Sequence, residues 1–303
     1  MIENTMRYSR QYVEKIVKLF PPENLSEFGK HNRNTRLPKF LISEIVKIYS
    51  HSDLTTVDLA RLYGVSQSAM YNYIRKSGCV MKTQSELQRK YTLDETFFDK
   101  IDTEGKAYML GFLYADGYNN EKRRTIQICL QERDKEILEK FKFLLKSNSP
   151  IHISEQKNKK YVSLAITSGK ISDNLVKYGC MQAKTFKIKF PTFLEEDLLR
   201  HFIRGYVDGD GYIGYYGECN RFELSITSTK EFCEELANIL VDKFGVHHAI
   251  RTRHPENNNN IRTLRITRKK DVINCINLFY KDATVYLERK YNKYLEILKL
   301  YGG

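Results

Sequence analysis

The sequence Met109-Leu-Gly-Phe-Leu-Tyr-Ala-Asp-Gly117 recurs in a second form as Ile203-Arg-Gly-Tyr-Val-Asp-Gly-Asp-Gly211. Each stretch is apolar, has helical character and ends in Asp-Gly. The pattern therefore predicts two helices that each deliver one carboxylate at the C-terminal end.

Each stretch also has two small residues four positions apart, which share one face of a helix. These residues are Gly111 and Ala115 in the first stretch and Gly205 and Gly209 in the second. Small residues let two helix backbones pack closely. Such packing would place the carboxylates of Asp116 and Asp210 side by side.

The glycines after the two aspartates, Gly117 and Gly211, are expected to end the helices. Glycine tolerates the left-handed conformation that is common just past a helix end. A simpler interpretation is that the stretches are two ordinary buried helices with glycine caps. The recurrence of the same residue order, with similar sequence after both copies, favours a shared function.

The pattern resembles that of the LAGLIDADG homing endonucleases, with Asp116 and Asp210 at the metal-binding acid position of that family. The resemblance implies a monomer that cleaves both strands of double-stranded DNA at a long recognition site. It implies that these carboxylates, with the backbone of Ala115 and Gly209, hold Mg²⁺. Ca²⁺ prefers more ligands and a looser geometry, and is expected to bind without efficient cleavage.

The two motif aspartates lie 94 residues apart, and the order helix, strand, strand, helix, strand, strand, helix follows both copies. The repeat is therefore a whole subdomain. We expect an α+β fold in which two αββαββα halves, residues 95–193 and 194–303, are related by a pseudo-two-fold axis. The resemblance implies that their strands form a saddle over DNA.

Composition supports a polyanionic partner. The 303 residues include 50 Lys and Arg against 37 Asp and Glu, a formal net charge of +13, which favours nucleic acid. No apolar run approaches the roughly 18 to 20 residues that span a bilayer, and the start lacks the features of a signal peptide. We expect a cytoplasmic or nucleoid-associated protein that is not secreted and does not bind membranes. Its six cysteines lack a Cys-x-x-Cys spacing.

Residues 1–90 are expected to form an all-α region with a DNA-binding unit at about 40–78. Two short helices joined by a tight turn at Gly64 resemble a helix-turn-helix, with Ser66 capping the second helix. That helix would enter the major groove. The residues nearest the bases would be Gln67, Ser68, Tyr71 and Asn72. The alternative is an unrelated helical hairpin.

Further residues match family positions near the reaction centre. Gln131 matches a position that orders water near the metal, and its counterpart in the second half lies around Ser228, with a possible shift of one or two residues in the alignment. Lys184 and Lys290 match a basic residue near the scissile phosphate. A plain surface role is the alternative for each. Asp208 is a third nearby carboxylate, but Tyr114 takes its place in the first half, which favours Asp116 and Asp210 as the metal ligands.

Strand alternation predicts which side chains face DNA. The second strand of each half would present Gln127, Arg221, Glu223 and Ser225. A later hairpin carries Arg251, Arg253, Arg262 and Arg265, with the run Asn257 to Asn260. Any one of these arginines could instead be merely solvated.

The sequence thus favours a site-specific, metal-dependent DNA endonuclease. The rival hypothesis is a non-cleaving protein on the same scaffold, either a DNA-binding regulator or a maturase that binds intron RNA. Only the nuclease requires a carboxylate at both motif positions, and both are present.

Overall fold

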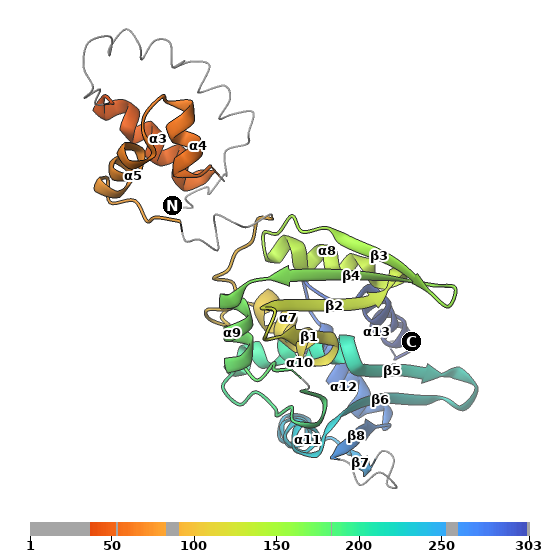
Figure 1. Cartoon of the computed structure of the whole chain (residues 1–303). Helices are drawn as coiled ribbons and strands as arrows, with labels where there is room; N and C mark the ends of the chain where they lie inside the picture. Colours follow the sequence, from red (N-terminus) through yellow and green to blue (C-terminus); the bar gives the residue numbers. More distant parts are fainter. Residues whose placement is uncertain (1–36, 53, 83–90, 183, 253–259, 302–303) are drawn as a thin grey trace, which may run out of the picture. The chain divides into compact units, whose positions relative to one another are not determined.

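The structure is a computed structural model that describes residues 37–52, 54–82, 91–182, 184–252 and 260–301 (Figure 1). Contacts divide the chain into two compact units, Met1–Lys90 and Tyr91–Gly303. Residues 1–36 of the expected all-α region lie outside the described residues, as do Arg253 and Asn257 to Asn259.

The first unit contains three described helices, which are α3 (Lys39–His51), α4 (Thr56–Leu62) and α5 (Gln67–Lys76). The Thr55 side chain caps α4 and accepts a hydrogen bond from Asp58 N, while the Asp58 carboxylate accepts one from Thr55 N. This reciprocal pair is a capping box. Ser66 caps α5 as expected, by accepting a hydrogen bond from Ala69 N.

The turn between α4 and α5 depends on Gly64, whose φ of +63° lies in the left-handed region that favours glycine. Ala60 is buried in the core of this unit, and Val65 packs against that core. The first unit is therefore a small helical bundle with α4 and α5 joined by a tight turn.

The first half of the second unit follows the predicted order. Its elements are α7 (Glu104–Asp116), β1 (Gly117–Asn120), β2 (Thr125–Gln131), the short 3-10 helix η1 (Glu132–Asp134), α8 (Lys135–Leu144), β3 (Ile151–Gln156), β4 (Lys159–Thr167), α9 (Gly169–Lys177) and the 3-10 helix η2 (Lys184–Phe186). Strand β1 extends to Asn120, since Asn119 and Asn120 both pair with β2.

The second half repeats this order. Its elements are α10 (Glu196–Asp210), β5 (Gly211–Tyr216), η3 (Gly217–Cys219), β6 (Arg221–Thr229), α11 (Lys230–Phe244), β7 (Ala249–Thr252), β8 (Ile261–Ile266), α12 (Lys269–Tyr280) and α13 (Glu288–Tyr301).

The strands form two four-stranded antiparallel sheets with matching order, β1-β2-β4-β3 and β5-β6-β8-β7 (Figure 1). The halves also match in register, because Gly117 pairs with Ile128 and Gly211 pairs with Ile226. Helices α8 and α9 pack on the first sheet, and α11 and α12 pack on the second. The fold is thus the predicted α+β arrangement of two repeated halves.

Helices α7 and α10 join the two halves through their small residues. A side chain added at Gly111 would come within 3.0 Å of the carbonyl oxygen of Phe202, and one at Gly205 would come equally close to the carbonyl of Tyr108. Backbone atoms cannot move aside as a flexible side chain can. The predicted close packing of the two motif helices is therefore present, and it is reciprocal between the halves.

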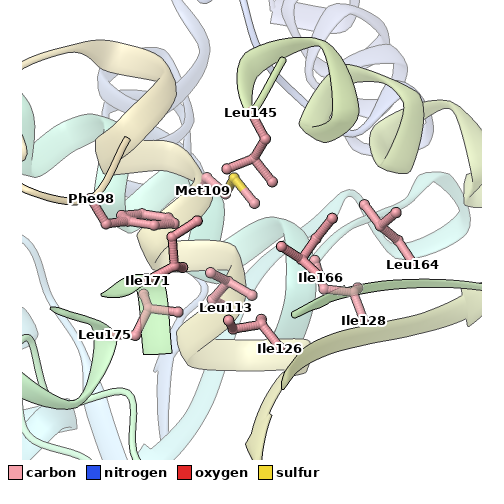
Figure 2. A pocket seen from close by; sticks show the side chains of 10 residues that line it. All are labelled: Phe98, Met109, Leu113, Ile126, Ile128, Leu145, Leu164, Ile166, Ile171 and Leu175. Atoms are coloured by element: carbon pink, nitrogen blue, oxygen red, sulfur yellow. The ribbon is translucent and has the colours of Figure 1, made fainter. Parts of the chain in front are cut away.

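The core of the first half is apolar and nearly filled. Ten side chains, including Met109, Leu113 and Ile171, surround a void of about 10 Å³ (Figure 2). A void of this size barely admits one water molecule, and an apolar lining offers it no hydrogen bonds. This void is a packing defect of the core and does not form a ligand site. None of the described helices is long and apolar enough to cross a membrane.

Candidate active site and nucleic-acid interface

Asp116 and Asp210 end the two packed motif helices and lie close together. A side chain added at Gly209 would be 3.4 Å from Oδ2 of Asp116. Both aspartates remain accessible to solvent. Desolvation by the packed helix ends, followed by repulsion from Asp210, raises the pKa of Asp116 to about 6. Two like charges held together in this way favour a bound cation.

The donor atoms at this place suit a hard divalent ion. Carboxylate and carbonyl oxygens are the ligands that Mg²⁺ and Ca²⁺ accept. The last turn of a helix leaves carbonyl groups without partners in the helix, and Ala115 and Gly209 lie in those turns. Within the residues that the structure describes, no group of three or more His, Cys, Asp or Glu side chains could hold a metal. A metal here would need backbone, water or phosphate oxygens besides the two aspartates.

Gly117 and Gly211 differ from the sequence-based expectation. Their φ values are −78° and −82°, which is extended backbone and not the left-handed conformation. A side chain added at either glycine would come within 3.0 Å of the carbonyl of Leu113 or Val207. Glycine is needed at both positions because the first residue of β1 or β5 packs directly against the last turn of α7 or α10, which leaves no room for a side chain.

Lys184 and Lys290 lie at the ends of the two motif helices. Lys184 Nζ donates to the carbonyl of Gly117. Lys290 Nζ donates to the carbonyls of Val207, Asp208 (2.9 Å) and Gly211 (2.6 Å). A cation at the C-terminal end of a helix also interacts favourably with the helix dipole.

The two lysines differ in burial. The Lys290 side chain is only 6% exposed, whereas Lys184 is half-buried. Desolvation lowers its pKa to about 8, although attraction to Asp208 acts in the opposite direction. The pKa of Asp116 is raised by desolvation and by Asp210. The positive charges of Lys290 and Lys184 act in the opposite direction and lower it.

Asp208 does not join the two exposed aspartates. Its carboxylate is fully buried and accepts hydrogen bonds from Tyr108 Oη (2.7 Å), Tyr280 Oη (2.5 Å) and Leu287 N (2.8 Å). Burial raises its pKa, with Lys290 opposing. Through these bonds Asp208 ties α10 to α7 and α12.

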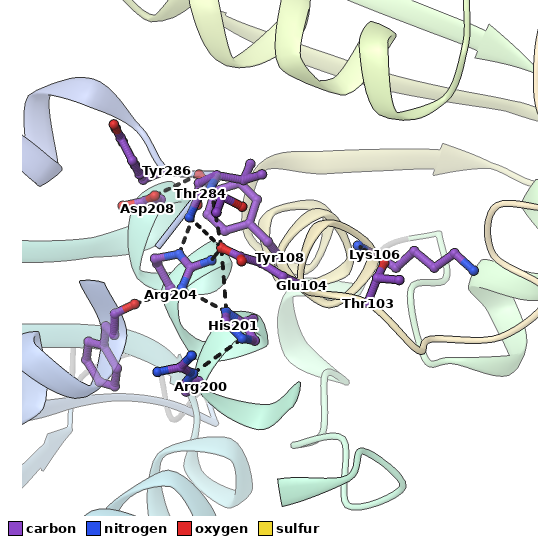
Figure 3. Close-up of polar contacts among 12 residues, drawn as sticks. Thr103, Glu104, Lys106, Tyr108, Arg200, His201, Arg204, Asp208, Thr284 and Tyr286 are labelled. Carbon is purple, nitrogen blue, oxygen red and sulfur yellow. Dashed lines mark hydrogen bonds and ion pairs between the residues drawn. The ribbon is translucent and has the colours of Figure 1, made fainter. Parts of the chain in front are cut away.

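A buried network that the sequence analysis did not identify surrounds Arg204 (Figure 3). The Arg204 guanidinium is 0% exposed and donates to Glu104 Oε1 (2.6 Å), Phe279 O (2.8 Å) and Val285 O (2.9 Å). Glu104 also accepts a bond from Thr284 N (2.8 Å). The network fixes the segment between α12 and α13 against the two motif helices. The sequence did contain a signal for this network, because Arg204 is a charged residue inside an otherwise apolar stretch of the second motif.

His201 belongs to this network, since Arg204 lies 3.0 Å from its Nδ1. Desolvation, followed by repulsion from Arg204, lowers the pKa of His201 from 6.5 to about 4, although Glu104 acts in the opposite direction. Between these values the unfolded chain binds a proton that the folded protein does not. The contribution of His201 to stability is therefore fully present above pH 6.5 and is lost as pH falls toward 4.

We expect the free energy of unfolding to decrease by about 3 kcal/mol over this range because of His201. The variant His201→Gln should flatten the pH dependence, measured by urea unfolding at pH values from 7 to 4. The control His248→Gln changes an exposed histidine and should keep the original slope. An unchanged slope in His201→Gln would refute this assignment.

Gln131 is exposed on β2, and its counterpart can be located from the strand register. Gly117 pairs with Ile128 and Gly211 with Ile226, so Gln131 corresponds to Thr229. Thr229 is one position beyond Ser228, within the one or two residues allowed for this alignment. Ser228 itself is buried, and its Oγ accepts a hydrogen bond from Tyr206 Oη.

The second sheet presents a charged cluster on the face away from α11 and α12. Glu223 accepts hydrogen bonds from Arg265 (2.7 and 2.9 Å) and Arg221 (2.7 Å). Burial acts to raise the pKa of Glu223, but the hydrogen bonds from the two arginines lower it, and the net result is a lowered pKa. Ser225 pairs with Arg265 across β6 and β8. In the first sheet Gln127 is exposed.

The strand register shows that the arginines of the β7–β8 hairpin do not all lie on the same face of the sheet. Arg251 pairs with Thr263, and Thr263 pairs with Thr227, which places Arg251 on the same face as Arg265. Arg262 pairs with Ser228, so it points to the opposite, helix-covered face. Its placement with the other DNA-facing arginines was incorrect, because alternate residues of a strand face opposite sides.

Two tyrosines on the exposed faces were missed. Tyr118 and Tyr212 each follow the Asp-Gly of a motif, pair with Gln127 and Ser225, and are 45% exposed. The signal was available, because tyrosine occurs at the same position in both copies. In the first unit, the exposed surface of α5 includes Gln67, Ser68, Tyr71 and Asn72.

The family model described as "LAGLIDADG-like domain" matches residues 104–178 and 197–278, one segment in each half. The chain belongs to this family.

Individual relatives are distant. The probable translation initiation factor IF-2 of Methanocaldococcus jannaschii is 28% identical over 313 aligned positions, which cover 94% of this chain and 25% of the relative. The chain thus spans about a quarter of the length of the curated relative it matches.

Among solved structures, the meganuclease I-SmaMI bound to uncleaveable DNA is 15% identical, with a TM-score of 0.43 over 66% of this chain and 89% of that chain. The I-LtrWI LAGLIDADG homing endonuclease bound to target DNA is 13% identical, with a TM-score of 0.42 over 69% and 91%. Full-length DUF199/WhiA from Thermatoga maritima is 21% identical, with a TM-score of 0.41 over 68% of this chain and 64% of that chain.

Proposed function

We propose that the chain is a site-specific DNA endonuclease that depends on a divalent metal, normally Mg²⁺. The observation that carries this proposal is the pair of solvent-accessible carboxylates, Asp116 and Asp210, at the adjacent ends of two repeated helices. A repeated structure that brings one acid from each half to one place suits a substrate with two similar strands.

Asp116 and Asp210 would hold the metal, with backbone carbonyls of Ala115 and Gly209 beside them. When bound, Mg²⁺ would lower the pKa of water and stabilise negative charge that develops on the phosphate. The residues of the chain have the complementary tasks of holding the ion, orienting the DNA and keeping the helix ends fixed. The Asp208 and Arg204 hydrogen bonds would perform the last task.

The exposed strand faces would bind the duplex. Arg251 and Arg265, which share one face of the second sheet, would contact phosphates or base edges, and Gln127 would do so on the first sheet. The net charge of +13 favours such binding. In the first unit, α5 would read neighbouring bases, because it is capped by Ser66 and presents polar side chains to solvent.

Selection from a random duplex library tests this proposal. The purified chain is incubated with the library and Mg²⁺, and cleaved molecules are captured by their new ends. We expect one long site to be enriched, with cuts on both strands, and we expect EDTA to prevent the cuts. Enrichment by binding without new ends would instead indicate a DNA-binding regulator. Retention of structured RNA alone would favour a maturase.

A further inference from the structure

The charged cluster on the second sheet consists of one carboxylate and two guanidinium groups. Glu223 and Arg221 lie on β6, and Arg265 lies on the neighbouring strand β8. Glu223 is only 9% exposed, whereas the side chains of Arg265 and Arg221 are 28% and 47% exposed. The carboxylate therefore lies at the base of the cluster, and the two arginines cover it and reach solvent.

Arg265 binds Glu223 through a two-point contact. Its Nε donates to Glu223 Oε1 (2.9 Å), and its Nη2 donates to Oε2 (2.7 Å). A guanidinium has five N–H donors in one plane. Within the part of the chain that the structure describes, Arg265 donates only to Glu223, so three donors remain on Nη1 and Nη2. The contact thus fixes the plane of the guanidinium and leaves its end edge available to a ligand.

Arg221 is held on two sides. Its Nη2 donates to Oε2 of Glu223 (2.7 Å), and its guanidinium carbon lies 5.3 Å from the centre of the Tyr216 ring. This distance allows a cation–π interaction. Tyr216 and Tyr212 also share a hydrogen bond between their hydroxyl groups (2.7 Å). Arg221 therefore keeps the carboxylate in place from the side opposite to Arg265, and the cluster is ordered before any ligand binds.

The first half has no such cluster at the matching positions. The strand register places Thr125 at the position of Glu223 and Ala165 at that of Arg265. The Thr125 hydroxyl shares a hydrogen bond with that of Thr167 (3.1 Å), and Ala165 is exposed. The repeated backbone therefore does not require charged residues here, and the cluster is a property of the second half.

A guanine suits the remaining edge of Arg265 better than a phosphate does. Guanine presents two adjacent acceptors in the major groove, O6 and N7, and an arginine fork binds both. Burial raises the pKa of Glu223, but the two arginines lower it below its usual value, so the carboxylate is ionised at neutral pH. Its negative charge repels a phosphate and does not repel a neutral base.

We infer that Arg265 reads a guanine in the major groove and that Glu223 is the positioning residue that gives Arg265 this specificity. Glu223 fixes the guanidinium plane through two hydrogen bonds and disfavours contact with the DNA backbone. The inference rests on the proposed function, and it adds one base of the recognition site. Because Thr125 and Ala165 occupy these positions in the first half, the guanine is expected in only one half of the site.

The test measures base preference through binding, without cleavage. The full chain is incubated with a random duplex library and Ca²⁺, and the bound duplexes are sequenced. Affinities for the selected duplex, its single-base variants and an unrelated duplex are then measured by fluorescence anisotropy. We expect guanine to be favoured by at least about tenfold at one position in one half of the site. The mirrored position in the other half should lack this preference.

Two variants examine the roles of the arginine and the carboxylate. Arg265→Lys keeps the charge but loses the planar fork, and it should reduce the guanine preference to less than about threefold. Preferences at the other positions should persist, which shows that the variant is folded. Glu223→Gln should reduce the same preference and strengthen binding to the unrelated duplex by about threefold, because it removes a negative charge from the DNA-binding face. A purely structural role for Glu223 would instead weaken binding to both duplexes.

Glu218→Gln is the matched control for loss of charge. Glu218 is exposed in the turn between β5 and β6, and its replacement should preserve the guanine preference. An unchanged preference in Arg265→Lys or in Glu223→Gln would overturn the inference, as would weaker binding of Glu223→Gln to both duplexes. A selected site that lacks this guanine would overturn the inference alone. Failure of the unmodified chain to select any sequence would count against the proposed function.

Discussion

Replacing Asp116 or Asp210 with asparagine is expected to slow cleavage of both strands by at least about a hundredfold, with little change in DNA affinity. Asparagine has nearly the same shape but lacks the negative charge that a hard divalent ion requires. Because Asp210 contributes to the raised pKa of Asp116, neutralising one carboxylate also relieves repulsion. The variants should therefore be at least as stable as the unmodified protein, and unfolding would not explain the lost activity.

The measurement combines single-turnover cleavage, DNA binding by fluorescence anisotropy and thermal unfolding for each variant. Glu218→Gln is a control, because it neutralises an exposed carboxylate in the β5–β6 turn. Asp208→Asn is the informative contrast, since it replaces one oxygen of a buried carboxylate that accepts three hydrogen bonds with an amide NH2 that cannot accept, and should mainly lower stability. Full cleavage by Asp116→Asn or Asp210→Asn would remove the basis for the proposed site.

The second large effect concerns the packing of α7 against α10. Gly205→Ala or Gly111→Ala should destabilise the second unit by ~3 kcal/mol, the upper end of typical overpacking effects. The added methyl group would meet a backbone carbonyl on the other helix, so the helices must separate. Because Asp116 and Asp210 lie at the ends of these helices, cleavage should also decrease under conditions in which the variant remains folded.

Gly217→Ala provides the matched control. A side chain added there would lie 3.6 Å from Cε1 of Tyr215, which is an ordinary contact. Urea unfolding of the three variants and the unmodified protein gives the comparison. If Gly205→Ala were no less stable than Gly217→Ala, the close approach of the two motif helices would be wrong.

Much of this architecture could be predicted from local patterns. The spacing of Gly111, Ala115, Gly205 and Gly209 was sufficient to predict the helix pair, because small residues on one helix face have a direct steric consequence. The repeat predicted two equivalent sheets. Alternation placed Gln127 correctly, since β2 alternates regularly between buried and exposed residues.

Other features depend on contacts that sequence spacing does not reveal. Arg204 meets Glu104, 100 residues away, and Asp208 meets Tyr280, 72 residues away. Glycine is needed at position 117 because a side chain there would collide with Leu113, and not because the backbone is left-handed at the helix end. Arg262 was misplaced because its whole hairpin was assigned to DNA without counting the alternation of its strand.

The most direct test of the central claim is to locate the metal. Crystals of the chain with its selected duplex, grown with Ca²⁺ and then soaked in Mn²⁺, would show the metal by anomalous scattering. The account predicts a peak in contact with the carboxylates of Asp116 and Asp210 and with a phosphate of the duplex. A bound duplex with no peak at these aspartates, or with Mn²⁺ held only elsewhere, would contradict it.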